Sequence, residues 1–268
     1  MLGKLMKYEW KATWKLLVSA NVLIFLMTII AWGMVRILDR SGGDFQMLDF
    51  MAVMVLLTYV ASMFAVSIGT GIFLIHRFYT STYGDQGYLL HTLPVDTHHI
   101  IIAKLLVSAA WELIVIVAIY LSVVSLALSA VSSNQLLHDM VDAMDNTVEY
   151  LGAEKISVFP VIMTLIAFLF SLFAKVLKVG ACISLGQLSS NHKLLLSFAW
   201  YIAIYVIEQI LQGVYFAIQL AFHRGLSYMD HVSYFDHQWE TTLIGGIISC
   251  VIFYLLTWYM MSRKLNLD

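Results

Sequence analysis

Six long apolar stretches divide this sequence, and they restrict what the chain can fold into more than any other feature. About 20 helical residues are needed to cross the roughly 30 Å hydrocarbon core of a bilayer. Stretches of about this length occur at Leu16–Val35, Phe50–Ile75, Leu105–Val131, Ser157–Ala174, Leu194–Ala221 and Thr242–Met261. Only 12% of the 268 residues are charged, whereas soluble domains carry about 25%. The sequence therefore predicts an all-α integral membrane protein with six transmembrane helices.

The basic residues predict how these helices are oriented, because lysine and arginine concentrate in cytoplasmic loops. With a cytoplasmic N-terminus, the predicted outer side holds only Arg36, Arg40, Lys155 and Arg224 of the 15 lysines and arginines. Both termini are then cytoplasmic, the inner loop covers residues 76–99, and the outer loops cover 36–49, 132–156 and 222–241. The fourth helix is expected to continue through Lys175 and Lys178 to about Ser190, and these lysines either mark the inner boundary or face a cavity.

The first 15 residues predict a separate amphipathic helix, followed by a six-helix transmembrane domain over residues 16–268. Its lysines fall in one narrow sector of a helical wheel, broadly opposite its leucines, methionine and tryptophans; they are Lys4, Lys7, Lys11 and Lys15. Such a helix lies in the membrane interface, with tryptophans in the lipid and lysines toward anionic headgroups. Membrane lipid is therefore an expected partner.

The inner loop displays aromatic and leucine side chains, which a short water-facing loop gains nothing by exposing unless something covers them. Asp85 can cap a short helix over Gln86–Leu93, which Pro94 ends because proline lacks a backbone N–H. This pattern indicates a docking element on the cytoplasmic face. A hairpin folded back on the protein's own helices is the alternative.

The fifth stretch carries polar residues along one helical face. They are spaced 4, 3, 4, 3 and 4 residues apart and comprise Tyr201, Tyr205, Glu208, Gln212, Tyr215 and Gln219. This polar stripe is not expected to face lipid, where its amide and carboxyl groups would be unsatisfied. It either packs against other helices or a partner subunit, or lines a translocation path. Glu112, in the third stretch, is the second acidic residue within a span and is expected to stabilise the bundle.

Small residues in the second stretch recur at every fourth position, at Ala61, Ala65 and Gly69, which predicts close helix packing. No phosphate-binding loop, zinc-protease helix or nucleophile elbow is present. The two cysteines lie in apolar stretches, and the acidic and histidine residues of the last outer loop match no metal-ligand spacing. We therefore expect no catalytic residue, no metal site, no cofactor in this chain and no nucleic-acid partner.

The inner loop also resembles a known family. Its run Asp85, Gln86, Gly87, Tyr88, Leu89, Leu90, His91, Thr92, Leu93, Pro94 and Val95 resembles the D-E-G-Y-L-x-x-T-L-P-V motif of permease subunits of bacterial type-2 ABC transporters, with Gln86 where the family usually has glutamate. The segments Leu5–Ala12 and Ile183–Lys193 are also similar to such permeases. The resemblance implies an N-terminal elbow helix and a coupling helix in the inner loop, formed by the residues just quoted. It also implies a cytoplasmic ABC ATPase subunit carrying ATP and Mg, and a second permease copy or paralogue.

Together these features predict the permease subunit of an ATP-driven exporter in a bacterial cytoplasmic membrane. Its substrate is expected to be amphipathic, such as a peptide, a lipid or a drug. Two other classes remain open. One is a sensor or immunity component that binds a membrane-active peptide without moving it. The other is an ATPase-independent secondary transporter or channel, driven by protons through Glu208 or Glu112.

Overall fold

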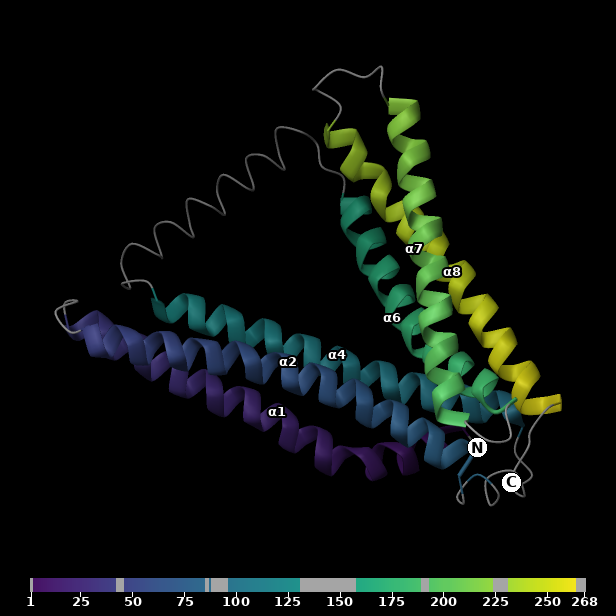
Figure 1. Ribbon diagram of the computed structural model, residues 1–268, viewed down its shortest axis with the longest axis horizontal. Coiled ribbons are helices and arrows are strands. Elements are labelled where there is room, and N and C mark those ends of the chain that lie inside the picture. The colour runs from purple at the N-terminus through teal and green to yellow at the C-terminus, as the bar shows by residue number, and fades with distance from the viewer. Residues whose placement is uncertain are drawn as a thin grey trace. The chain divides into compact units, whose positions relative to one another are not determined.

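The computed structural model describes residues 2–41, 46–84, 87, 96–130, 158–188, 193–223 and 231–263. All regular structure in these residues is helical. The helices are α1 (Leu2–Ser41), α2 (Gln46–Thr82), α4 (Thr97–Ala130), α6 (Val158–Gly186), α7 (Lys193–His223) and α8 (His231–Arg263) (Figure 1). All six are long and apolar enough to cross a membrane, which confirms the predicted number of spanning helices. Helices suit lipid because they satisfy every backbone hydrogen bond internally.

The helices extend beyond the predicted spans. At 1.5 Å per residue, the 40, 37 and 34 residues of α1, α2 and α4 are about 50–60 Å long, so part of each lies outside the hydrocarbon core. α1 continues to Ser41 and α8 begins at His231, which leaves less of the predicted outer loops 36–49 and 222–241. α1 also runs without a break through residue 15. The structure therefore does not confirm a separate interfacial helix over residues 1–15.

The described chain forms two compact units, and the division falls inside α2 and α4. The N-terminal unit contains α1 from Gly3, α2 up to Leu74 and α4 from Leu106. The C-terminal unit contains α2 from Ile75, α4 up to Leu105, and α6, α7 and α8. Each unit has its own buried core, so each is described separately.

In the N-terminal unit, aromatic and polar contacts join α1 to α4 and α2. Trp111 of α4 is 2% exposed and stacks on Trp10 of α1 with ring centroids 4.6 Å apart. Its indole N–H donates a 3.0 Å hydrogen bond to Thr13 Oγ1. Trp10 was predicted to lie in lipid, but it packs on Trp111 of the same protein. The Trp111 indole offers a ring for Trp10 to stack on and an N–H for Thr13.

One hydroxyl connects all three helices of the N-terminal unit. Ser122 Oγ of α4 lies 2.6 Å from Thr28 Oγ1 of α1 and 2.7 Å from Tyr59 Oη of α2. All three side chains are buried. Apolar packing gains little in lipid, because lipid tails are as apolar as the side chains, so interhelical hydrogen bonds help to fix how these helices pair.

Replacing Ser122 with alanine is expected to destabilise the N-terminal unit by about 1 kcal/mol, because both interhelical bonds are lost. Tyr59→Phe should cost less, since the bond between Thr28 and Ser122 remains. Thermal unfolding of the purified protein in detergent, followed by helical circular dichroism, measures both effects. Ser125→Ala, one turn further along α4, is the control, because this hydroxyl bonds only within its own helix, to the carbonyl of Ser122. Equal losses for Ser122→Ala and Ser125→Ala would contradict the prediction.

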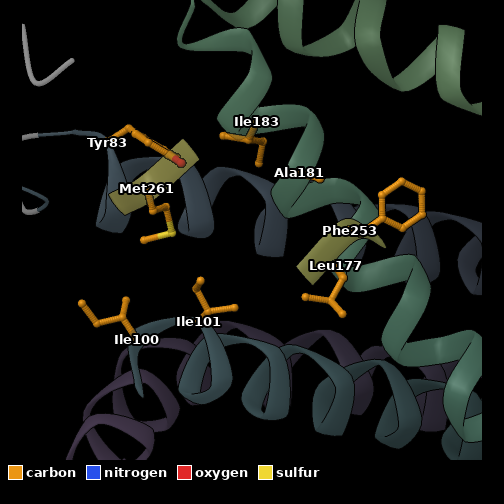
Figure 2. Packing of buried hydrophobic residues seen from close by; sticks show 8 residues of the cluster. All are labelled: Tyr83, Ile100, Ile101, Leu177, Ala181, Ile183, Phe253 and Met261. Carbon is orange, nitrogen blue, oxygen red and sulfur yellow. The ribbon is translucent and has the colours of Figure 1, made fainter. Parts of the chain in front are cut away.

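In the C-terminal unit, α6 packs against both α7 and α8 (Figure 1). A buried apolar cluster lies where the inner parts of α2 and α4 meet α6 and α8 (Figure 2); its members are Tyr83, Ile100, Ile101, Leu177, Ala181, Ile183, Phe253 and Met261. Gly180 of α6 belongs to the same contact, because a Cβ there would lie 3.2 Å from the Phe78 ring of α2. The absence of a side chain at this position lets the two helices approach closely.

Candidate functional site

An ion pair inside two neighbouring spans is the central feature of the C-terminal unit. Lys178 Nζ of α6 lies 2.7 Å from Glu208 Oε2 of α7, and the side chains are 13% and 27% exposed. Both residues fall inside candidate membrane spans, at Ile162–Gly186 and Lys193–Ile218. Lys178 thus turns its ammonium group to a carboxylate on the next helix.

The pair has an aromatic neighbour. Lys178 Nζ also lies 5.5 Å from the centre of the Tyr201 ring, two turns before Glu208 on α7. The ring face attracts a cation, and this attraction strengthens where water is excluded. The Lys178 ammonium group thus contacts a carboxylate and an aromatic ring face that both belong to α7. Inside a span an ionised side chain costs at least about 2.5 kcal/mol, and the pair offsets part of that cost.

The other described side chains of the polar stripe are exposed. Tyr205, Gln212 and Tyr215 are exposed on α7, and the side chain of Gln219 lies outside the described residues. α7 also has the smallest buried share of the six candidate spans. The stripe therefore divides into two parts. Tyr201 and Glu208 face α6, while Tyr205, Gln212 and Tyr215 are open to lipid, a path or a partner subunit.

Most of the predicted docking element lies outside the described residues: Asp85, Gln86, Tyr88, Leu89, Leu90, Leu93 and Pro94. Gly87 is described, and its N–H donates to the carbonyl of Gly84 at 2.7 Å. The residues on both sides of this segment are described as well, and both sides are attached to other helices of the C-terminal unit.

On the N-terminal side of the loop, Tyr83 attaches the end of α2 to α6. Its hydroxyl donates a 2.7 Å hydrogen bond to Ser184 Oγ, which in turn donates to the carbonyl of Gly180 at 2.8 Å. Burial raises the pKa of Tyr83 to about 12, against a smaller lowering by Ser184. The phenol therefore stays protonated, and keeps donating, throughout the physiological pH range. Close by, the buried Lys104 of α4 donates to Ser81 Oγ and lies 5.6 Å from the centre of the Phe78 ring.

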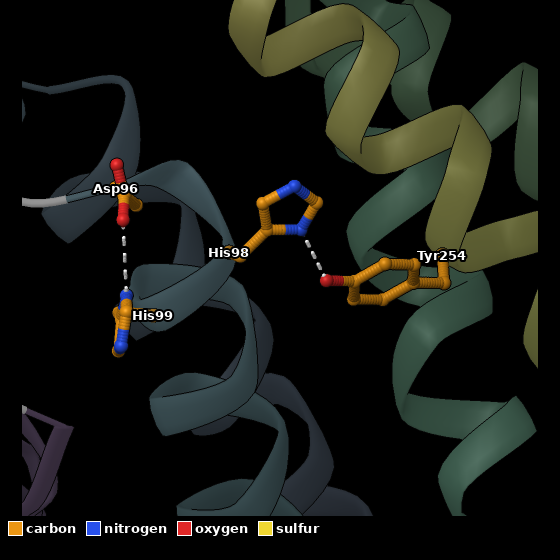
Figure 3. A network of polar contacts seen from close by, with 4 residues as sticks. All are labelled: Asp96, His98, His99 and Tyr254. Atoms are coloured by element: carbon orange, nitrogen blue, oxygen red, sulfur yellow. Dashed lines mark hydrogen bonds and ion pairs between the residues drawn. The ribbon is translucent and has the colours of Figure 1, made fainter.

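On the C-terminal side of the loop, His98 attaches the start of α4 to α8. Its Nδ1 lies 2.6 Å from Tyr254 Oη (Figure 3). The imidazole also stacks on the rings of Tyr254 and Trp258, with centroids 5.9 Å and 5.3 Å away. Next to it, His99 Nδ1 lies 3.8 Å from Asp96. His98 thus fixes the first turn of α4 to two aromatic side chains of α8 that lie one turn apart.

The small residues of α2 and Glu112 of α4 belong neither to the Lys178–Glu208 pair nor to the contacts on the two sides of the loop. Ala61, Ala65 and Gly69 are exposed, and α2 turns its other side, with Tyr59, toward α4. Their predicted helix packing is therefore not made within the N-terminal unit. Glu112 is half-buried beside Trp111 on α4. In the part of the chain that the structure describes, no group of histidine, cysteine, aspartate and glutamate side chains could hold a metal ion.

No protein-family model, no curated protein and no solved structure matches the chain. What the protein does is therefore argued from its own residues. Sequence reasoning found Glu208 from its spacing, but it missed the partner Lys178 and the attachments made by Tyr83 and His98. A lysine within an apolar stretch was the available signal for Lys178. The bonds of Tyr83 and His98 join residues 101 and 156 positions apart, which no local pattern reveals.

Proposed function

We propose that this chain is the transmembrane permease subunit of an ATP-driven exporter in a bacterial cytoplasmic membrane, with both termini in the cytoplasm. The observation that carries this proposal is the ion pair between Lys178 and Glu208, which joins two adjacent spans. Ionisable residues inside spans are costly and mark substrate or ion pathways by default. A structural bundle in lipid could make the same contact with apolar side chains at lower cost.

The substrate is amphipathic, and we expect a peptide, a lipid or a drug. The exposed part of the polar stripe offers two phenols and an amide along one face of α7, at Tyr205, Gln212 and Tyr215. Apolar rings with polar tips suit a molecule that has both kinds of surface. Gln219 continues the same face in the sequence. A second copy of the chain, or a paralogue, supplies the other side of the path.

The attachments on both sides of the inner loop support a coupling mechanism. In this proposal a cytoplasmic ATPase, which holds ATP and Mg, presses on the coupling helix around Tyr88 and Leu89. Tyr83 and His98 lie on the two sides of that segment, so displacement of the loop pulls on α6 through Ser184 and on α8 through Tyr254. α6 also carries Lys178, so its movement reaches Glu208 on α7. Switching transitions of this kind shift packed helices against each other.

Charged substitutions in the loop test the proposal. The chain is co-expressed with its genomic neighbours, and an ATPase that co-purifies with it in detergent is reconstituted together with it. Tyr88→Asp with Leu89→Asp is expected to abolish co-purification of the ATPase and substrate-stimulated ATP hydrolysis, because the docking surface becomes negative and polar. The matched control is Tyr150→Asp with Leu151→Asp, the same residue pair in the predicted outer loop 132–156. The control should retain the ATPase.

Three results would contradict the proposal. One is an unmodified chain that purifies alone and moves substrate without any ATPase. Another is equal retention of the ATPase by the loop variant and by its outer-loop control. A loss in both variants would also contradict it, because docking would then not be specific to the inner loop.

One alternative, a secondary transporter driven by protons, would use the same ion pair. In that case the Glu208 carboxylate takes up a proton from one side of the membrane, releases Lys178, and re-forms the pair after releasing the proton to the other side. Flux would then collapse when the proton gradient is dissipated, and it would persist without ATP. For the exporter, the same uncoupler leaves ATP-driven flux into inverted vesicles unchanged, so one vesicle experiment distinguishes the two functions.

A further inference from the structure

The N-terminal part of α1 carries a row of lysines that none of the contacts above uses. Lys4, Lys7, Lys11 and Lys15 are spaced 3, 4 and 4 residues apart, so at 100° per residue they occupy a sector of about 80°. All four side chains are exposed. This lysine face therefore presents four positive charges in a line along one side of a continuous helix.

The opposite face of the same helix is held by the protein. Thr13 and Leu17 are almost fully buried, Trp10 stacks on Trp111 of α4, and Met6 packs on the apolar cluster formed by Leu17, Leu74, Val107 and Trp111. These contacts fix the rotation of α1 about its own axis. The lysine face cannot turn inward, so it points permanently away from α4.

The depth of the lysine face follows from the length of the span. The candidate span that includes these lysines runs from Leu2 to Leu38, which at 1.5 Å per residue is about 55 Å. This exceeds the roughly 30 Å of hydrocarbon, so one part of α1 projects. Four charged side chains cannot remain in hydrocarbon, and the half-exposed Trp14 is typical of the interface. The lysine face thus extends outward from the hydrocarbon boundary, through the layer of lipid headgroups.

We propose that Lys4, Lys7, Lys11 and Lys15 form a binding surface for anionic phospholipid headgroups. The phosphate-bearing headgroups of one leaflet complement a line of ammonium groups that begins at the edge of the hydrocarbon, and each lysine near an anionic surface contributes about a fivefold factor in affinity. The exposed Tyr8 borders this sector, and its phenol has the polar tip and apolar ring typical of the interface. Lipid binding by this surface requires no ATPase, so its test does not depend on the outcome of the exporter test.

The test measures which lipids stay with the full-length protein. The protein is reconstituted in nanodiscs made from mixed phosphatidylglycerol and phosphatidylcholine, and the lipids retained after stepwise exchange into detergent are counted by native mass spectrometry. The unmodified chain should enrich phosphatidylglycerol. Replacing all four lysines with glutamine should lower this enrichment by about 600-fold, the product of four fivefold factors. Replacing all four with arginine keeps the charge and should preserve the enrichment.

Folding and source controls accompany this measurement. Helical circular dichroism and thermal unfolding in pure phosphatidylcholine verify that the glutamine variant is folded, since the buried face with Trp10 and Thr13 is unchanged. Equal enrichment in the unmodified and glutamine proteins would overturn the proposal. Displacement of phosphatidylglycerol by low concentrations of inorganic phosphate would also overturn it, because the site would then bind a soluble anion. Capture of RNA or an acidic protein in preference to lipid would do the same.

Discussion

Lys178→Met is expected to destabilise the C-terminal unit by about 3 kcal/mol, one of the two largest effects predicted for any single substitution in this protein. The change leaves the Glu208 carboxylate between α6 and α7 without the ammonium group that lies 2.7 Å away. Removing one partner of a buried pair typically costs about 3–5 kcal/mol, because the other charge is left uncompensated. Thermal unfolding in detergent, monitored by helical circular dichroism, measures the loss.

A double substitution separates the charge from the packing. Lys178→Met combined with Glu208→Leu removes both charges and is expected to recover most of the lost stability, since apolar residues of similar volume often replace buried pairs without cost. Lys175→Met, one turn earlier on α6 and exposed, is the matched control and should change little. If the single and double variants are equally unstable, the contact matters through packing and the electrostatic explanation fails.

The same double variant tests the functional role of the pair. A folded double variant that no longer transports would indicate that the pair acts in the transport cycle. A folded double variant that transports normally would reduce the pair to a structural contact, and the observation that carries the exporter proposal would be lost.

Trp111→Ala is the other large expected effect, with a loss of about 3 kcal/mol in the N-terminal unit. The indole is almost fully buried, stacks on Trp10 and donates to Thr13. Truncation of a buried tryptophan leaves a cavity and typically costs about 3–5 kcal/mol. Trp111→Phe should cost less, about 2 kcal/mol, because a smaller ring still stacks on Trp10, while the hydrogen bond to Thr13 and part of the buried volume are lost.

The control for this prediction lies on α1. Trp14→Ala removes a tryptophan that is 46% exposed, so it should shift the thermal midpoint far less than Trp111→Ala. Comparable shifts for the two alanine variants would show that Trp111 is not a packing centre. The same comparison indicates whether α1 is held by α4 or by lipid.

The number of spanning helices could be predicted from the sequence because a bilayer admits few alternatives. An apolar stretch of span length must satisfy its backbone internally, so hydropathy alone identifies the helices. Their ends were less accurately predicted, as the extensions of α1 to Ser41 and of α8 back to His231 show. Outside the hydrocarbon, water satisfies helical and non-helical backbone alike, so composition no longer restricts where a helix stops.

Only the α7 side of the candidate site could be predicted from the sequence. Spacing placed Tyr201 and Glu208 on one face of α7, and periodicity is a property of a single helix. The choice of Lys178 as partner depends on how α6 and α7 pack, which no single-helix pattern contains. Spacing also does not separate the part of the stripe that faces α6 from Tyr205 and Gln212, which are exposed. That division depends on tertiary contacts.

The ion pair also constrains how the chain enters the membrane during synthesis. Lys178 is made 30 residues before its partner Glu208, so α6 alone would present an uncompensated ammonium group to lipid. α6 ends at Gly186 and α7 starts at Lys193, and a Cβ at Gly186 would collide with Ser197 Oγ, so the two helices approach closely where they turn back. Biogenesis therefore favours release of α6 and α7 from the insertion machinery together, as a helical hairpin in which Lys178 and Glu208 are already paired.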